Sequence, residues 1–384
     1  MSSLPASSSQ LLSPGGGYVG EVAYIFAYDI AYEMPRQVTG TLLGQPIRHF
    51  DFDPRQHHAP RKALFYRPDM IRLPAQVCQG PHGPVEVRRT VKLYPVGAIS
   101  ITLHVPISVQ SVPDLACYHE LKLDGQPVHG LAYSLAQEIL EELRPWLDRP
   151  AEALADEGAY VVFCLASDGP DGGPLRQASQ WLADHRLDVA GLLNQEPDYR
   201  RLSSEEIEDA VANYQSYYAH DLVVMDWDAA LIINEERAFG DVLHAMELAN
   251  VQLVELEVYD RLLDTSLQGA YRDMRQRLKV RAKVSDSLRE IRVDLARLTD
   301  ELSNVGKFFG DWHMAKVYQR IAGLLHLEDW RRTIDDKLMT LDSLYQILKQ
   351  DQVNRLLVYL EFSVVIIFLI DLVLVFAGLL INLK

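Results

Sequence analysis

The sequence predicts an α+β domain, followed by long α-helices with a coiled-coil hairpin and then a single C-terminal transmembrane helix. Three observations lead to this fold class: strand-like segments up to residue 234, an apolar heptad pattern after it, and a final apolar run. The chain has 384 residues, of which 48% are hydrophobic and 23% charged, enough to bury a sizeable core. The predicted divisions are a disordered segment 1–18, the α+β domain 19–234, a helical and coiled-coil region 235–352 and the transmembrane helix 353–384.

The α+β domain is predicted from strand and helix patterns that follow one another in mixed order. The strand-like segments are "EVAYIFAYDIAYEM", "KALFYRP", the hairpin "VEVRRTVKLYPVGAISITLHVPI" with its turn at residues 95–97, "AYVVFCLAS" and the pair "LVVMDWDAALIIN". Helices are predicted over "LAYSLAQEILEELRPWL" and over "SSEEIEDAVANYQSYY", where Ser203 or Ser204 begins a capping-box pattern. Helices and strands in this order are typical of the α+β class.

After residue 234 apolar residues recur at alternating steps of three and four. The first seam is Phe239, Val242, Met246, Ala249, Leu253 and Leu256. The second seam is Val284, Leu288, Ile291, Leu295, Leu298, Leu302 and Val305, with charged residues between its members. A third seam is Ile334, Leu338, Leu341, Tyr345 and Leu348. This spacing predicts a helical hairpin with coiled-coil packing.

The final segment, "RLLVYLEFSVVIIFLIDLVLVFAGLLINLK", predicts a membrane span. It holds no basic residue between Leu356 and Leu383, and a hydrocarbon core needs roughly 20 mostly apolar residues. The first residues, "MSSLPASSSQLLSPGGG", lack the pattern of a signal or transit peptide, so we expect a tail-anchored protein. Lys349 and Arg355 precede the run, which places the bulk of the chain on the cytoplasmic side, in a bacterial inner membrane.

Two carboxylates interrupt this apolar run and need a partner. A charged side chain at the bilayer centre costs about 2.5 to 3.5 kcal/mol on insertion scales. Steps of three and four place the acids on one stripe, for which we predict a transmembrane oligomer seam formed by Glu361, Phe368, Asp371, Gly378 and Asn382. Two alternatives stay open. In the first, Glu361 lies near the membrane–water interface and the bilayer accommodates Asp371 at a modest free-energy cost. In the second, the two acids line the pore of an oligomeric ion channel or transporter.

A basic stretch, "YRDMRQRLKVRAK", stands out in an acidic chain. The formal net charge of -16 argues against a protein that coats nucleic acid, so any anion-binding surface must be local. We predict that this stretch binds an anionic partner, which is either RNA or the ribosome, or anionic lipid headgroups. The residues of the predicted surface are Arg272, Arg275, Arg277, Lys279, Arg281 and Lys283. The competing interpretation is a solvated helix face.

Catalytic motifs are absent from the sequence, so we predict no enzyme and no cofactor. There is no P-loop, no GxGxxG after a strand, no GxSxG and no HExxH. Asp226 and Asp228 predict a hairpin turn in preference to a catalytic pair, and Cys117 lies near His119 without indicating a nucleophile. One donor-rich loop has a spacing that matches no defined metal site and consists of His49, Asp51, Asp53, His57 and His58. The widely spaced cysteines, which favour a reducing compartment, are Cys78, Cys117 and Cys164.

Several segments resemble the DUF155 family, the "required for meiotic nuclear division" proteins of mitochondria and their bacterial and fungal relatives. The segments are "LEFSVVIIFLIDLVLVF", "DVLHAMELANVQLVELEVYDRLL", "WHMAKVYQRIAGLLHLEDWRRTIDDKLMTLDSLYQIL" and, more loosely, "AYIFAYDIAYEM", where Asp29 stands in place of a glycine. The resemblance implies a membrane-anchored, coiled-coil-bearing protein without an established catalytic activity; mitochondrial members resemble inner-membrane factors that support organelle translation. We therefore expect a bacterial-type member acting as a homo-oligomeric scaffold or tether.

Overall fold

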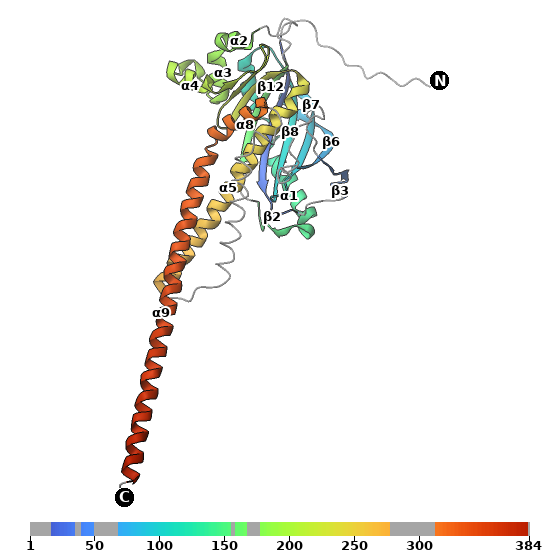
Figure 1. Ribbon diagram of the computed structural model, residues 1–384. Helices are drawn as coiled ribbons and strands as arrows, with labels where there is room; N and C mark the ends of the chain where they lie inside the picture. Colours follow the sequence, from blue (N-terminus) through green and yellow to red (C-terminus); the bar gives the residue numbers. More distant parts are fainter. Residues whose placement is uncertain are drawn as a thin grey trace. The chain divides into compact units, whose positions relative to one another are not determined.

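A computed structural model describes residues 17–34, 40–49, 68–154, 158–166, 177–276 and 312–382 (Figure 1). The chain divides into two compact units. Unit 1 comprises Met1–Glu255 with Glu301–Glu328, and unit 2 comprises Leu256–Asp300 with Asp329–Lys384. Unit 1 is an α+β domain built on one large sheet, as predicted, and the described part of unit 2 is helical.

Nine strands of unit 1 form one sheet within the described residues. Their order is β13 (Tyr214–Gln215), β14 (Leu222–Met225), β15 (Ala229–Asn234), β12 (Gly158–Ala166), β1 (Tyr18–Asp29), β8 (Ala98–Val109), β7 (Gly83–Leu93), β6 (Asp69–Gly80) and β5 (Arg48–His49). All neighbours pair antiparallel except β12 and β15, which are parallel. Three small pairs flank this sheet: β2 (Ala31–Glu33) with β11 (Asp148–Pro150), β3 (Thr41–Leu42) with β4 (Gln45–Pro46), and β9 (Lys122–Leu123) with β10 (Gln126–Pro127).

Both faces of the sheet are covered, which explains why β1 is apolar almost throughout. One face carries alternate residues such as Val22, Tyr24 and Phe26 into the main core. The elements that contribute to this core are α1 (Val128–Leu143), α2 (Ala178–Asp184), α3 (Arg186–Leu193), α4 (Ser204–Ala212) and the 3-10 helix η1 (Val112–Tyr118). The short 3-10 helices η2 (Arg144–Trp146) and η3 (Tyr199–Arg201) complete this side.

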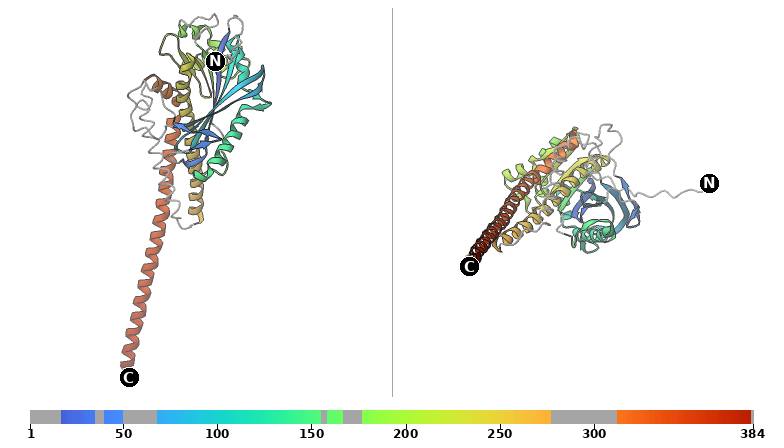
Figure 2. Two further views of the ribbon diagram at one scale, coloured as in Figure 1. Left: turned by 90° about the vertical axis from the view of Figure 1, so that its right-hand side faces the viewer. Right: turned by 60° about the horizontal axis from the view of Figure 1, so that its bottom comes forward.

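The long helix α5 (Glu236–Gln276) begins in unit 1 and packs on the opposite face of the sheet. Figure 2 shows α1 and α5 on opposite sides of the sheet. Asn250 of α5 donates to the Gly158 carbonyl of β12 at 2.8 Å, and a Cβ on Gly158 would lie 2.6 Å from a Val254 methyl carbon. The close approach of the helix to β12 therefore depends on a glycine at position 158.

Most predicted elements of the α+β domain are present. The hairpin between β7 and β8 turns where expected, with the Tyr94 amide donating to the Ala98 carbonyl at 2.8 Å. Ser203 caps α4, accepting from the Glu206 amide at 3.1 Å. The helix predicted over residues 203–218 is too long, because the chain leaves the helix after Ala212 and forms β13. The predicted strand at residues 62–68 lies almost wholly outside the described residues.

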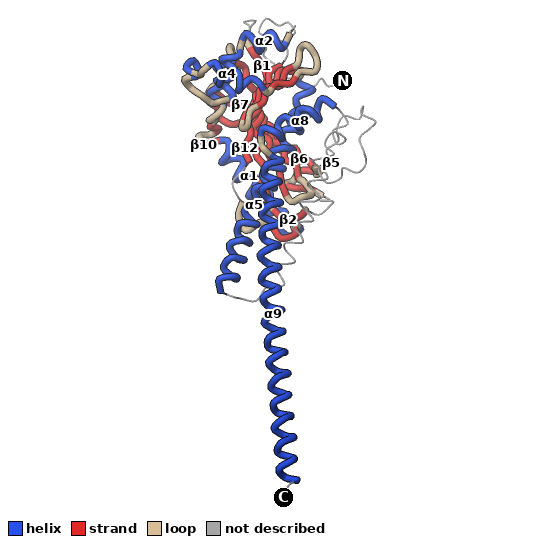
Figure 3. Tube along the Cα trace, turned by 60° about the vertical axis from the view of Figure 1, so that its left-hand side comes forward, coloured by secondary structure: helices blue, strands red, loops and turns tan. Residues whose placement is uncertain are grey.

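In unit 2, residues 256–276 of α5 lie beside the first part of α9 (Leu327–Asn382), and α9 continues beyond them, as Figure 3 shows. Lys337 Nζ lies 2.6 Å from Oδ1 of both Asp260 and Asp264. The buried apolar residues of these two segments are Leu256, Leu263, Ala270, Ile334, Leu338, Leu341 and Leu344. Ile334, Leu338 and Leu341 confirm three positions of the third predicted seam. The second predicted seam, residues 284–305, lies outside the described residues.

The predicted transmembrane helix is not supported and has to be corrected. Among the residues that the structure describes, none of the helices has an apolar stretch long enough to cross a bilayer. The segment also carries Glu361 and Asp371, and a charged side chain at the bilayer centre costs about 2.5 to 3.5 kcal/mol. This finding contradicts the transmembrane helix of the predicted fold, the tail anchor and the predicted membrane localisation, and the pore alternative depends on that helix.

Candidate functional site

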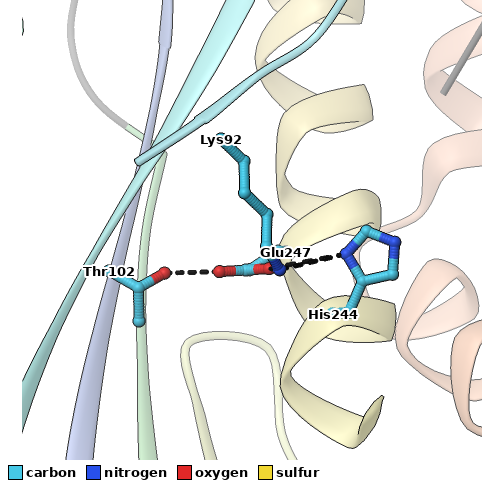
Figure 4. A network of polar contacts seen from close by, with 4 residues as sticks. All are labelled: Lys92, Thr102, His244 and Glu247. Carbon is cyan, nitrogen blue, oxygen red and sulfur yellow. Dashed lines mark hydrogen bonds and ion pairs between the residues drawn. The ribbon is translucent and has the colours of Figure 1, made fainter. Parts of the chain in front are cut away.

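A buried polar network joins α5 to the sheet in unit 1 (Figure 4). Lys92 of β7 forms an ion pair with Glu247 of α5, and its ammonium also donates to Nδ1 of His244 at 3.2 Å. The other Glu247 oxygen accepts from the Thr102 hydroxyl of β8. These four side chains are buried, so the network clamps the helix to two strands away from water.

The charges in this network stabilise one another. Burial alone would raise the pKa of the Glu247 carboxyl, but the Lys92 ammonium, followed by the neighbouring His244 ring, lowers it to about 2. Burial, followed by the Lys92 charge, lowers the pKa of His244 to about 4. His244 is therefore neutral near pH 7, which leaves Nδ1 able to accept the proton that Lys92 donates.

Acid is expected to destabilise unit 1 through these two groups. The unfolded chain protonates His244 near its ordinary pKa of 6.5, whereas the folded chain does so only near 4, so stability falls as the pH drops through this window. Glu247 adds a second loss between its ordinary pKa of 4.5 and about 2. The His244 contribution is about 3 kcal/mol. Urea unfolding followed by circular dichroism between pH 7 and 4 measures it.

The matched control is His244→Asn, because an asparagine oxygen can accept from Lys92 in place of Nδ1 but does not titrate. This variant is expected to lose stability less steeply than the wild type between pH 6.5 and 4. Equal slopes in this window would show that His244 does not carry the pH dependence.

A second feature of unit 1 is an open polar groove at the edge strand β13, beside α8 (Trp312–Leu324). It has a volume of about 640 Å³ and is lined by Asn213, Gln215, Lys316, Gln319, Arg320, Gly323, Leu324 and His326. None of these described lining residues carries a carboxylate. Arg320 lies against Asn213, with Nη1 3.4 Å from Oδ1, which orients the guanidinium toward β13.

Two exposed aromatic side chains, Trp312 and Tyr217, lie near the start of α8. The Lys316 ammonium lies 5.5 Å from the centre of the Trp312 ring, and Trp312 is 67% exposed. Tyr217, which is 61% exposed, has its ring 5.2 Å from that of His313. Tyr318 anchors the buried side of α8 by donating to Gln252 of α5. The groove therefore stands on a helix that is fixed to the core.

The predicted site residues that the structure describes lie on α5 and α9, and their roles stay predictions. Glu361, Phe368 and Asp371 are exposed on α9, whereas Gly378 and Asn382 belong to the same helix without described side chains. In the predicted anionic-partner surface, Arg272 is exposed near the described end of α5. The side chain of Arg275 and the whole of Arg277, Lys279, Arg281 and Lys283 lie outside the described part.

The other sequence candidates do not assemble a reaction centre in the described residues. Asp226 and Asp228 lie in the turn between β14 and β15, as predicted, and burial followed by the Asp226 charge raises the pKa of Asp228 to about 6. Cys117 donates to the Asp114 carbonyl, whereas His119 donates to the Leu192 carbonyl, so the thiol and the imidazole bond to different groups.

The donor-rich loop is described only at His49, which contacts Asp69. Its predicted partners, Asp51, Asp53, His57 and His58, lie outside the described residues. No group of three or more metal-ligating side chains occurs in the described part of the chain.

Sequence reasoning missed both the network and the groove. Lys92, Thr102 and Glu247 each interrupt an apolar stretch, and a charged residue inside a buried segment is the available signal for an internal ion pair. The groove has a weaker signal, because Asn213 and Arg320 lie far apart in sequence and become neighbours only in the folded unit.

The described chain is thus a mixed-sheet α+β domain with a basic groove at its edge, continued by long helices. It belongs to the family described as "Uncharacterized protein MJ0711, N-terminal domain", whose model matches residues 19–239. This is a DUF155-like family, which confirms the resemblance at that level. The match covers the domain in which the sequence resemblance was looser.

A relative supports the same assignment. "Uncharacterized protein MJ0711" of Methanocaldococcus jannaschii is 22% identical over 250 residues, which cover 64% of this chain and 74% of the relative. No solved structure matches the chain.

Proposed function

We propose that the chain is a non-catalytic, homo-oligomeric scaffold that associates through α9 and presents its α+β unit to a partner. One observation carries this proposal: α9 has a long series of large apolar side chains that are exposed. They are Val353, Leu356, Leu357, Val358, Tyr359, Leu360, Phe362, Val364, Val365, Ile366, Ile367, Phe368, Leu369, Ile370, Leu372 and Leu374. Monomeric proteins rarely expose contiguous apolar patches beyond a few hundred Å².

A second copy of the chain is the occupant that we favour for this surface. Within unit 2, residues 256–276 of α5 pack against α9 around Lys337, but the apolar residues from 353 onward have no such cover in the described structure. No basic residue lies between Leu356 and Leu383, so Glu361 and Asp371 have no cationic partner on their own segment. Association of identical helices buries both the apolar side chains and the predicted seam.

The mass of the purified chain in a mild detergent tests this proposal. Light scattering is expected to give several copies for the full chain and one copy for a fragment ending at Gln350. A single copy of the full chain would overturn the scaffold proposal.

A pair of variants tests the predicted seam within the oligomer. Asp371→Leu removes a hydrogen-bonding carboxyl from the stripe and is expected to lower the copy number. Ile366→Ala is the matched control, because position 366 lies about 140° around the helix from both Glu361 and Asp371, and it should leave the copy number unchanged. An unchanged mass for Asp371→Leu would exclude the hypothesis that Glu361, Phe368 and Asp371 form the oligomer seam.

The narrower assignment to a bacterial-type member is also a proposal.

A further inference from the structure

The groove between β13 and α8 is a ligand-sized feature of the described residues. Its volume of about 640 Å³ lies in the range of small-molecule sites, which is roughly 300 to 1,000 Å³. It belongs wholly to unit 1 and is separate from the α9 surface on which the scaffold proposal rests.

The cationic side chains of the groove converge from one helix face. Lys316 and Arg320 are four residues apart on α8, so both project toward β13 from the same side of the helix. His326 follows the end of α8 and lines the same groove. In a chain with a formal net charge of -16, a groove with cations and no carboxylate in its lining selects for an anion.

The remaining lining residues narrow the kind of anion. Asn213, Gln215 and Gln319 supply amide donors and acceptors, which suit the edges of a nucleobase or the hydroxyls of a sugar. Trp312 beside Lys316 offers an exposed aromatic face on which a base can stack. A bare inorganic anion would use the cations alone and leave these groups without a role.

Gly323 makes the room for such a ligand. A Cβ at this helical position would have no atom within 4 Å, so the groove opens directly over the backbone of α8. A side chain there would fill the groove without striking the protein.

We propose that this groove binds a nucleotide, with Lys316, Arg320 and His326 on its phosphate and the three amides and Trp312 around its base. A free nucleotide and a nucleotide within a single strand share this chemistry, and the experiment separates the two sources.

The experiment compares two glycine variants in the full chain. Gly323→Leu puts a side chain into the groove and favours the helix. Gly240→Leu is the matched control, because it is also a helical glycine with no atom within 4 Å of its Cβ, and it lies outside the groove. Calorimetry and fluorescence anisotropy measure binding of adenosine monophosphate, a single-stranded ten-nucleotide RNA and inorganic phosphate.

We expect the wild type and Gly240→Leu to bind adenosine monophosphate or the RNA, and Gly323→Leu to bind at least about tenfold more weakly. Lys316→Gln is expected to weaken binding and to reduce its salt dependence. Binding of the monophosphate assigns a free nucleotide, and binding of the RNA without the monophosphate assigns a strand. Binding of inorganic phosphate alone, no binding of any probe, or equal affinity of the two glycine variants would overturn the proposal.

Discussion

Replacing Lys92 with methionine is expected to lower the free energy of unfolding by about 3 to 5 kcal/mol, the range for breaking a buried ion pair from one side. Lys92 and Glu247 are both buried, and the ammonium is the charge that holds the Glu247 carboxyl ionised. Methionine has a similar length but carries no charge. Of its described contacts, the carboxylate would then keep the Thr102 hydroxyl and His244 as polar neighbours.

Urea unfolding at pH 7 measures this loss, and two further variants locate its cause. Lys92→Met combined with Glu247→Gln removes both charges and keeps an oxygen that accepts from Thr102, so at least half of the lost stability should return. Arg201→Met breaks an exposed ion pair with Asp198 and should change stability little. If the double variant is no more stable than Lys92→Met alone, the cost arises from packing and not from an unpaired charge.

Replacing Gly97 with alanine is expected to lower the free energy of unfolding by about 3 kcal/mol or more. Gly97 has φ of +96°, a region that costs other residues about 1 to 3 kcal/mol. A Cβ here would also lie 1.8 Å from the Ala31 carbonyl oxygen, which belongs to the backbone and cannot move aside alone. The Gly97 carbonyl accepts from the Ile30 and Ala31 amides at 2.9 and 3.1 Å, so the turn is tied to β2.

Gly83→Ala separates the two causes. Gly83 has φ of +116° at the tip of the hairpin between β6 and β7, and a Cβ there would meet no atom within 4 Å. Its variant should show the conformational cost alone, so Gly97→Ala should be clearly less stable in the same urea unfolding experiment. Equal losses would mean that the chain at Ala31 yields to the new methyl group.

Local patterns predicted the elements better than their ends. The hairpin around residues 95–97 and the cap at Ser203 were predicted because turn residues and capping patterns act within a few positions. The helix over residues 203–218 was predicted too long, since Asn213 and Tyr214 do not stop a helix by propensity alone. The chain leaves the helix because Tyr214 and Gln215 pair with Val224 and Val223 of β14.

The first helical seam shows the limit of an amphipathic reading. Phe239, Val242, Met246 and Ala249 are buried as predicted, but so are His244 and Glu247 on another side of α5. A single apolar stripe predicts one buried face, whereas this part of the helix lies between the sheet and α8. Polar residues can be buried there because partners from distant strands satisfy them.

The apolar end of the chain shows a different limit. Hydropathy predicted a helix there, and α9 extends to Asn382 as a helix. The inference from an apolar helix to a membrane crossing is the step that the described structure contradicts, because none of its described helices is long and apolar enough to cross a membrane.

By itself the sequence determined what local forces decide: which segments form strands, which form helices, and where tight turns and caps interrupt them. The tertiary structure alone decided that β12 lies parallel to β15, that Lys92 meets Glu247 across 155 positions, and that Asn213 and Arg320 face one groove. The physical reason is that periodicity reports only which face of an element is buried. The partner of that face depends on chain closure between distant residues, which no local pattern encodes.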